Sequence, residues 1–493
     1  MGERTDGVVL AFDQGTTNAK AMLVDPTSGG VVVAASRPVD VSFPAHGMVE
    51  QAADQLWSAT LAAAEECLAR RPEADLVGVS ISNQRESVVC WERSTGRPLG
   101  PVLGWQDART AAWCADLAER RPDAPAAVRS RTGLSLDPMF SAPKMRHALD
   151  AATAAGVALA DITVGTVDAW LVWRLTGELA IEAGNASRTL LLDLQTLEWD
   201  RELLDLFGVP IGVLPEVRAS DAGFGRTVGL GGIPPGVPVV AVLADSHAAL
   251  YYHGCTVPGT GKVTYGTGSS VMTPVAGPTR APDGISTTLA WHADGAPTYA
   301  REGNILASGS ALDWTAATLG SSGAVPGGEF LSDLAAQVSS ADGVCLVPAF
   351  TGLGAPYWDR SASGMLTGLT AGTTRAHVAR AALEAVAHQV VDVVEAVESD
   401  GEARIEALQA DGGATASRLL MQLQADLLGR PVNVADEPEA SALGAARLAA
   451  RTLGFAAPAA AVTQRVSPGP LDRRASREHW ARSVRRSRGL AVT

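Results

Sequence analysis

The sequence predicts an α/β fold built from two related halves. Apolar β-type runs alternate with amphipathic helical stretches along the chain, which is typical of layered α/β domains. A short strand, a Gly-Thr turn and a second strand open the chain around Gly15-Thr16. The same pattern returns around Gly266-Thr267, about half the chain later. We therefore expect each half to begin with a β-hairpin whose tip is Gly-Thr.

The composition limits the class of protein before any element is placed. The chain has 493 residues, 46% of them apolar and 19% charged, which is ordinary for a globular protein of several domains. A net charge of −14, from 53 acidic and 39 basic residues, argues against nucleic acid or an anionic membrane as a partner. The apolar run 237–244 is far shorter than a membrane-spanning helix.

The cysteines indicate a reducing compartment. They are odd in number, widely spaced and without a CxxC pair, so neither a disulfide framework nor a zinc site is expected. We therefore expect a cytoplasmic protein. The cysteines are Cys67, Cys90, Cys114, Cys255 and Cys345.

The elements of the first half follow from apolar runs and turn residues. A Gly/Pro-rich stretch, 229–238, is expected to separate the two halves, with a buried strand at 239–244 directly after it. Earlier in the chain we expect strands at 8–12, 20–24 and 76–82, and a helix at 54–70.

The second half opens with the hairpin 262–272 and ends in an arginine-rich amphipathic helix at 473–488. Between them we expect a surface loop at 320–328, a helix at 377–397, a strand at 405–410 and a helix at 417–428. These elements suggest an N-terminal domain over 1–247, a C-terminal domain over 248–455, and a tail, 456–493, whose helix packs back on the body.

The hairpin tips are candidate phosphate sites. Small residues let backbone N–H groups approach phosphate oxygens, and the threonine hydroxyls add donors. Neither tip is a P-loop, and no GxGxxG motif opens a helix after a strand, which disfavours a Rossmann site. Each tip taken alone would also fit an ordinary tight turn.

Two carboxylates end predicted strands beside these tips. Asp13 leads into the first hairpin, and Asp245 follows the strand 239–244. Mg²⁺ prefers one or two carboxylates together with phosphate and water oxygens. The pair predicts phosphoryl transfer, in which one carboxylate orients the metal and the other accepts a proton from the attacking hydroxyl. Each aspartate alone would also fit a turn or a helix cap.

Three further features suggest ligand contacts. Arg85 and Glu86 follow the strand 76–82, where α/β ligand sites form, and fit vicinal hydroxyls or a surface ion pair. Trp105 fits an apolar wall or a place in the core. Gly412-Gly413 link a strand to a helix, and would either face a phosphate or sugar or form a plain turn.

Together the motifs resemble the FGGY carbohydrate kinase family, with glycerol kinase and other polyol kinases nearest in appearance. The resemblance covers nearly the whole chain. Its phosphate-type motifs are Ala11 to Thr17 and Tyr265 to Gly268, and Asp411-Gly412-Gly413 resembles the adenosine motif. Its other segments are 47–51, 82–86, 104–107, 166–170, 185–189 and 364–384.

The resemblance implies an actin-like ATPase (ribonuclease H-like) fold, with a catalytic cleft between two domains that close on ligand. It also implies ATP and Mg²⁺ as cofactors, and a homodimer or homotetramer. By this likeness Asp245 is the catalytic base, and Asp13 and Asp245 hold the metal. The polyol or sugar contacts are Arg85, Glu86, Trp105, Met139, Asp245 and Ser246. The nucleotide contacts are Thr16, Thr17, Lys20, Gly266, Thr267, Gly309, Asp313, Gly412, Gly413 and Ser417.

Several residues depart from the glycerol kinase pattern. Met139 stands where a tyrosine is usual, Ser246 where a glutamine is usual, and Ser270 where an aromatic residue is usual; His247 offers a further polar contact. These exchanges predict a wider pocket, for a four- or five-carbon polyol or related sugar. The alternatives are glycerol kinase proper, a xylulokinase-like ketose kinase and, in a different class, a catalytically silent sugar-binding regulatory protein.

Overall fold

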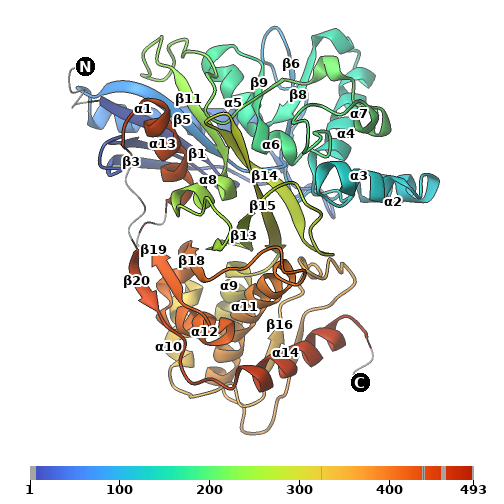
Figure 1. Cartoon of the computed structure of the whole chain (residues 1–493), viewed down its shortest axis with the longest axis vertical. Helices are drawn as coiled ribbons and strands as arrows, with labels where there is room; N and C mark the ends of the chain where they lie inside the picture. Colours follow the sequence, from blue (N-terminus) through green and yellow to red (C-terminus); the bar gives the residue numbers. More distant parts are fainter. Residues whose placement is uncertain (1–6, 324, 436, 438, 457–461, 491–493) are drawn as a thin grey trace.

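Within residues 7–323, 325–435, 437, 439–456 and 462–490, the computed structural model contains two α/β bodies that lie one above the other, each around a large sheet (Figure 1). The first body holds the N-terminal part of the chain, and the second holds most of the C-terminal part.

The sheet of the first body begins with the predicted hairpin. Its strand order is β11 (Val239–Ala244), β5 (Asp75–Asn83), β1 (Gly7–Gln14), β2 (Asn18–Val24) and β3 (Val31–Pro38). Strands β1, β2 and β3 are antiparallel neighbours, whereas β1, β5 and β11 run parallel. The carboxyl ends of β1, β5 and β11 therefore meet at one edge of the sheet.

The sheet of the second body repeats this arrangement. Its strand order is β14 (Ser286–Ala293), β15 (Ala296–Ile305), β13 (Ser269–Val275), β12 (Thr260–Tyr265), β18 (Ala407–Asp411), β19 (Val432–Ala435) and β20 (Val462–Val466). Here too an antiparallel hairpin, β12–β13, comes first; β12 pairs in parallel with β18, which in turn pairs in parallel with β19. The expectation of two related, hairpin-first halves is confirmed.

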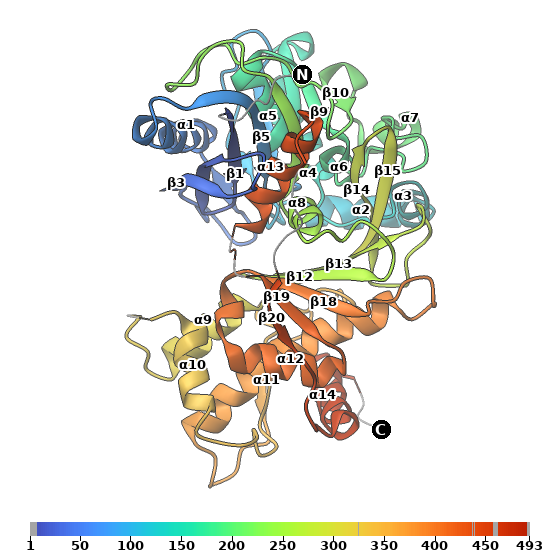
Figure 2. The same ribbon diagram turned by 60° about the vertical axis from the view of Figure 1, so that its left-hand side comes forward.

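Helix α13 (Ala440–Thr452), in the C-terminal part of the chain, returns to the first body. It packs against β1, β5 and β11 and against α8 (Asp245–Tyr252), as Figure 2 also shows. Helix α1 (Ala53–Arg70) packs against β2 and β3. The remaining helices of the first body are α2 (Ala111–Arg120), α3 (Ala124–Thr132), α4 (Ser141–Ala154), α5 (Val167–Thr176), α6 (Ala183–Ser187) and α7 (Arg201–Phe207).

Smaller strands complete both bodies. They are β4 (Glu50–Gln51), β6 (Val88–Glu92), β7 (Val102–Leu103), β8 (Ile162–Thr166), β9 (Ala180–Glu182), β10 (Glu216–Arg218), β16 (Cys345–Val347) and β17 (Met365–Thr367). Short 3-10 helices lie at Leu159–Asp161, Ile211–Val213 and Gly413–Ala416.

Helices pack together on the second body's sheet. The long α11 (Arg375–Val397) contacts α9 (Gly309–Thr318), α10 (Gly327–Ala335), α12 (Arg418–Leu428) and α14 (Arg473–Ser487). In α14, Trp480 is buried and its indole N–H donates to Asp392 of α11 at 2.7 Å. The apolar face predicted for the tail helix is therefore the face that packs.

One expectation about loops was wrong. The stretch 229–238 does not separate the halves, because the strand that follows it, β11, pairs with β5 inside the first sheet. The surface loop expected at 320–328 is confirmed except for its last two residues, since α10 begins at Gly327; residue 324 lies outside the described residues.

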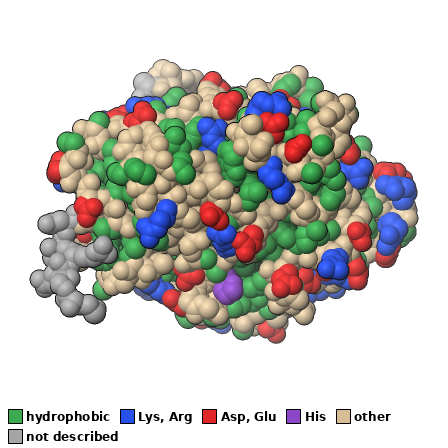
Figure 3. Space-filling model, turned by 90° about the horizontal axis from the view of Figure 1, so that it is seen from above, with side chains coloured by type: hydrophobic (Ala, Val, Ile, Leu, Met, Phe, Trp, Pro, Cys, Tyr) green, Lys and Arg blue, Asp and Glu red, His purple; other side chains and the backbone are tan. Residues whose placement is uncertain are grey.

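The surface carries mixed charge. Figure 3 shows acidic and basic side chains interspersed with apolar ones on the face seen from above. Among the residues that the structure describes, no helix has both the length and the apolar character needed to cross a membrane.

Candidate active site

Both bodies line a cavity of about 230 Å³ that gathers most of the predicted site residues. From the first body come Thr16, Arg85, Glu86, Trp105, Met139, Asp245 and Ser246. From the second body come Thr264, Gly266, Thr267, Gly268, Ser269, Ser270, Asn304, Ile305 and Leu306. All residues predicted to contact the acceptor therefore meet, although Thr16, predicted as a nucleotide contact, lies among them.

A strained turn after β5 presents Arg85 and Glu86. Glu86 has a φ of +61°, a left-handed conformation that side chains other than glycine rarely adopt. It is held there because its carboxylate accepts from Arg188 Nε at 2.6 Å and its carbonyl accepts from Ser141 Oγ at 3.1 Å. Such strain is typical of functional turns that their surroundings fix.

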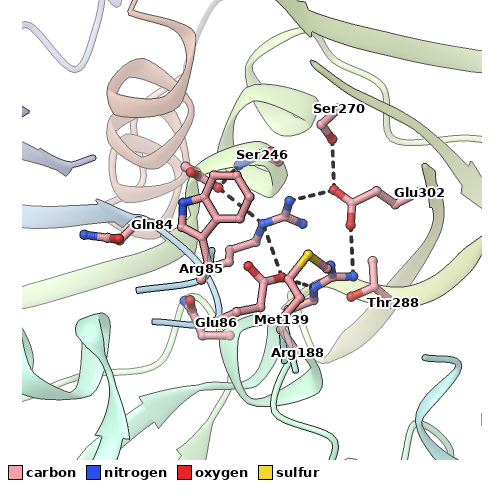
Figure 4. Close-up of polar contacts among 12 residues, drawn as sticks. Gln84, Arg85, Glu86, Met139, Arg188, Ser246, Ser270, Thr288 and Glu302 are labelled. Atoms are coloured by element: carbon pink, nitrogen blue, oxygen red, sulfur yellow. Dashed lines mark hydrogen bonds and ion pairs between the residues drawn. The ribbon is translucent and has the colours of Figure 1, made fainter. Parts of the chain in front are cut away.

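A buried charged cluster supports this turn (Figure 4). Glu302 of β15 lies between two guanidinium groups, with Arg85 Nη2 at 2.7 Å and Arg188 Nη1 at 2.9 Å. Ser270 Oγ donates to the same carboxylate at 2.9 Å. Despite complete burial, the two arginines hold the pKa of Glu302 well below its usual range. The cluster joins the two bodies directly behind the cavity.

Asp245 is the first residue of α8. Its carboxylate accepts from the backbone N–H of Ser246 at 2.6 Å and lies 3.3 Å from Arg85 Nε. The side chain is 37% exposed, so it remains accessible from the cavity. Desolvation raises the pKa of Asp245, while the Arg85 charge opposes that rise. A carboxylate in this state can accept a proton from a hydroxyl group.

Asp13 lies at the end of β1, on the edge of the sheet where β11 leads into Asp245. Its carboxylate accepts from Ser82 Oγ at 3.0 Å. Burial raises the pKa of Asp13 to about 6, and repulsion from Asp245 adds to the rise. Two carboxylates that repel each other fit a divalent cation, which also takes phosphate and water oxygens. In the described part of the chain, no three His, Cys, Asp or Glu side chains form a metal cage.

Trp105 and Met139 form an apolar wall whose position is fixed from behind. The Trp105 indole N–H donates to Thr16 Oγ1 at 3.1 Å, which ties the wall to the first hairpin tip. The buried Lys144 ammonium donates to the carbonyls of Met139 at 2.7 Å and Gly104 at 3.2 Å. Burial lowers the pKa of Lys144 to about 8.

A second cavity, of about 460 Å³, adjoins the first. The two share Trp105, Met139 and Leu306 as walls. The second cavity is also lined by Phe43, Met48, Leu353 and Trp358, and by the polar His46, Gln106, Asp107, Thr351 and Arg360. Met139 therefore lies between an inner and an outer cavity.

Three predicted nucleotide glycines crowd around the second hairpin tip. The backbone N–H of Gly309 donates to the Gly266 carbonyl at 3.0 Å, and a Cβ on Gly309 would lie 2.5 Å from that carbonyl oxygen. Gly412 has a φ of +93°, and a Cβ there would lie 2.4 Å from the Tyr265 carbonyl oxygen. Only glycine allows these backbones to approach so closely. Gly413 beside them faces open space.

The other predicted nucleotide residues lie away from the inner cavity. Lys20 forms an ion pair with Glu439 at 2.6 Å, and Thr17 is exposed. Asp313 lines a separate cavity of about 640 Å³ beside α9 and α10. Ser417 caps α12 by accepting from Leu420 N–H, and its hydroxyl lies 2.6 Å from that of Ser332. Neither Lys20 nor Thr17 lines the cavity that contains Asp245.

His247 does not supply a new polar contact to the cavity. It is fully buried behind the cavity wall, and among the described residues neither ring nitrogen has a hydrogen-bond partner. Burial, together with the nearby Arg85 charge, places the pKa of His247 well below its usual range. The ring is therefore neutral.

Glu302 and Arg188 are the site residues that sequence reasoning missed. Arg188 lies in the segment 185–189, which was recognised as a motif but given no role. Glu302 lies in mid-strand and pairs with a residue more than 200 positions away. The one signal for it is the charged pair Arg301-Glu302 in the middle of a strand, where both side chains are buried.

Two matched folding units, with paired carboxylates and a polar cavity between them, define a phosphotransferase of the actin-like ATPase class. The chain belongs to the FGGY family of carbohydrate kinases: residues 8–251 match the family's N-terminal domain and residues 261–453 match its C-terminal domain. It is therefore an ATP-dependent carbohydrate or polyol kinase.

Individual relatives agree with this assignment. An apulose kinase of Pectobacterium atrosepticum is 47% identical over 91% of this chain and 90% of its own length. A glycerol kinase of Alkalilimnicola ehrlichii is 41% identical over 98% of this chain and 99% of its own length. The solved structure of Plasmodium falciparum glycerol kinase with ADP is 25% identical and superposes with a TM-score of 0.87 over 98% of both chains.

Proposed function

We propose that this kinase transfers the γ-phosphoryl group of ATP to a hydroxyl of a four- or five-carbon polyol or ketose. The observation that carries the proposal is the inner cavity, in which Arg85, Glu86 and Asp245 face a small polar space between the bodies. A donor guanidinium beside two acceptor carboxylates suits a ligand with adjacent hydroxyls.

Asp245 acts as the base. As the acceptor oxygen forms its bond to the γ-phosphorus, Asp245 takes the hydroxyl proton, and the bond between the γ-phosphorus and the bridging oxygen breaks to release ADP. Arg85 keeps the Asp245 carboxylate ionised and in place through their 3.3 Å contact. Asp13 and Asp245 would hold Mg²⁺, which neutralises phosphate charge when bound.

The two bodies divide the ligands between them in this proposal. The N-terminal domain, 1–247, holds the acceptor, and the C-terminal domain, 248–455, holds the nucleotide at Gly266, Thr267, Gly309, Gly412 and Gly413. All five cysteines are free and buried, which supports a reducing, cytoplasmic setting.

Three side chains support an acceptor larger than glycerol. Ser246, Ser270 and Met139 all line the inner cavity, and none of them brings an aromatic ring into it. Past Met139 the outer cavity gives a longer acceptor further room. The similarity to an apulose kinase favours a branched five-carbon ketose, whereas the similarity to glycerol kinases favours glycerol itself.

The test is Mg²⁺- and ATP-dependent ADP release with a panel of acceptors: glycerol, erythritol, the threitols, xylitol, ribitol, arabitols, xylulose and apulose. We expect the highest kcat/KM with a four- or five-carbon acceptor. The Asp245→Asn variant should lose roughly 10²- to 10⁴-fold in kcat, because it removes the base. Glycerol as the best acceptor would contradict the wider pocket. Saturable binding without ADP release would indicate the regulatory alternative.

A further inference from the structure

Four charged side chains form a buried ion-pair cluster behind the acceptor cavity, although burial disfavours charge. Arg188 and Glu302 are completely buried, and Arg85 and Glu86 are only 7% and 5% exposed. Buried charges are costly to desolvate unless excellent geometry compensates. A cluster of this kind contributes little to stability compared with apolar residues, but it does fix the orientation of the side chains that it joins.

We infer that Glu302 is a positioning residue, which aims the Arg85 guanidinium at the acceptor from the opposite body. This inference rests on the proposed function, because Arg85 is taken there to hold the acceptor. Glu302 comes from β15 of the second body, whereas Arg85 follows β5 of the first. One carboxylate from the second body thus fixes a ligand-binding group of the first.

The contacts of Arg85 show how this positioning works. Nη2 is fixed by Glu302 at 2.7 Å, and Nε faces Asp245 at 3.3 Å. Among the described residues, Nη1 has no hydrogen-bond partner although it is buried. A buried donor without a partner is costly, and Arg85 lines the cavity, so an acceptor hydroxyl is its natural partner.

Glu302 reaches the other side of the turn through Arg188. Its second carboxylate oxygen lies 2.9 Å from Arg188 Nη1, and Arg188 Nε donates to Glu86 at 2.6 Å. Ser270, which lines the cavity, donates its hydroxyl to Glu302 at 2.9 Å. Arg85, Glu86 and Ser270 therefore share one anchor, and loss of this anchor should affect acceptor binding before nucleotide binding.

The Glu302→Gln variant tests the inference. It keeps the shape of the side chain but removes the charge that orients both guanidinium groups. We expect the KM for the best acceptor to rise roughly 10- to 100-fold, as for loss of a hydrogen bond to a charged group. The KM for ATP should stay within about twofold. An unchanged acceptor KM, or an equal rise in both constants, would overturn the inference.

Asp400→Asn is the matched control. Arg301, the neighbour of Glu302 on β15, forms an ion pair with Asp400 at 2.6 Å, away from the cavity. This control removes an ion pair from the same strand and should leave both KM values unchanged. If it raises the acceptor KM as much as Glu302→Gln does, the effect comes from a weakened β15 and not from positioning.

Two further measurements keep the inference testable. Glu302→Asp retains the charge, so it should fold even if the Gln variant does not. Its shorter side chain cannot hold both arginines at their present distances, so the acceptor KM should still rise, and an unchanged KM would count against positioning. Calorimetric binding of the acceptor needs no turnover. A wild-type protein that binds acceptor without releasing ADP contradicts the proposed function, while the comparison of Glu302 variants remains decisive.

Discussion

At the scale of single residues, Asp13 is expected to determine how kcat/KM for ATP depends on pH. Its pKa is raised to about 6, so the carboxylate becomes protonated as the pH falls through that value. A protonated carboxyl group binds Mg²⁺ poorly, because metal ligands must be deprotonated. We therefore expect kcat/KM for ATP to fall below pH 6. A tenfold higher Mg²⁺ concentration should move the midpoint to lower pH, by up to about one unit.

The measurement is a pH profile at two Mg²⁺ concentrations, with the ATP concentration held constant. A midpoint that does not move with Mg²⁺ would assign the acid limb to another group. Asp245 is the obvious one, since its pKa is raised as well and it must be ionised to accept a proton.

A second prediction for a single residue concerns Ser270 and the size of the acceptor. A Ser270→Phe variant places a ring in the inner cavity and removes the hydroxyl that donates to Glu302. We expect the ratio of kcat/KM for glycerol to that for a five-carbon acceptor to rise by about tenfold, the size of one specificity contact. Thr273→Ser, on the same strand but bonded to the Thr260 carbonyl, is the control. A ratio that stays constant would mean that Ser270 does not limit acceptor size.

Some of these residues follow from the sequence and others do not. Asp13 and Asp245 were predictable because both end strands, and parallel strands bring such ends to one edge of a sheet. Glu302 was not, because it lies in mid-strand and its partners Arg85 and Arg188 come from the other body. The local sequence pattern predicts a strand, but it does not predict which side chains of the other body its residues contact.

At the scale of elements, local signals placed most strands and helices well. The hairpins β1–β2 and β12–β13, the strand β11 and the tail helix lie within a few residues of where they were expected. The Gly/Pro-rich stretch 229–238 does not separate the halves as expected. Such composition indicates a turn, but it does not show which strands pair on either side of that turn. Likewise, nothing in the sequence of α13 shows that it returns to the first sheet.

The turn between β18 and α12 offers a matched pair of glycine substitutions. A Cβ on Gly412 would clash with the Tyr265 carbonyl, and its φ of +93° is unfavourable for alanine. Gly412→Ala should therefore lower the melting temperature and raise the KM for ATP together. A Cβ on Gly413 meets open space, so Gly413→Ala should leave stability unchanged and raise the KM for ATP only.

Thermal denaturation measures the stability of both variants, and titration with ATP measures their nucleotide affinity. If Gly413→Ala binds ATP as the wild type does, the nucleotide does not approach this turn closely. Gly266, Gly309 and the cavity beside Asp313 would then be the places to look for nucleotide contacts.

At the scale of the whole molecule, several contacts join the bodies around the site. Glu302 reaches Arg85, Lys20 of β2 pairs with Glu439 at the start of α13, and α13 itself packs on the first sheet. Because residues of both bodies line the inner cavity, an acceptor that fills it touches both at once. Binding of one ligand should then favour the arrangement that binds the other.

This arrangement predicts positive coupling between acceptor and nucleotide. We expect ADP to bind roughly 5- to 100-fold more tightly when the acceptor is saturating, a coupling of about 1–3 kcal/mol. Linkage requires that ADP tighten acceptor binding by the same factor. Calorimetric titration of ADP with acceptor present, and of acceptor with ADP present, should therefore give the same factor. Glu302→Gln should reduce the factor, because it removes the charge that joins Arg85 to the second body, whereas Asp400→Asn should not. Equal ADP affinity with and without acceptor would mean that the two bodies bind their ligands independently, despite sharing one cavity.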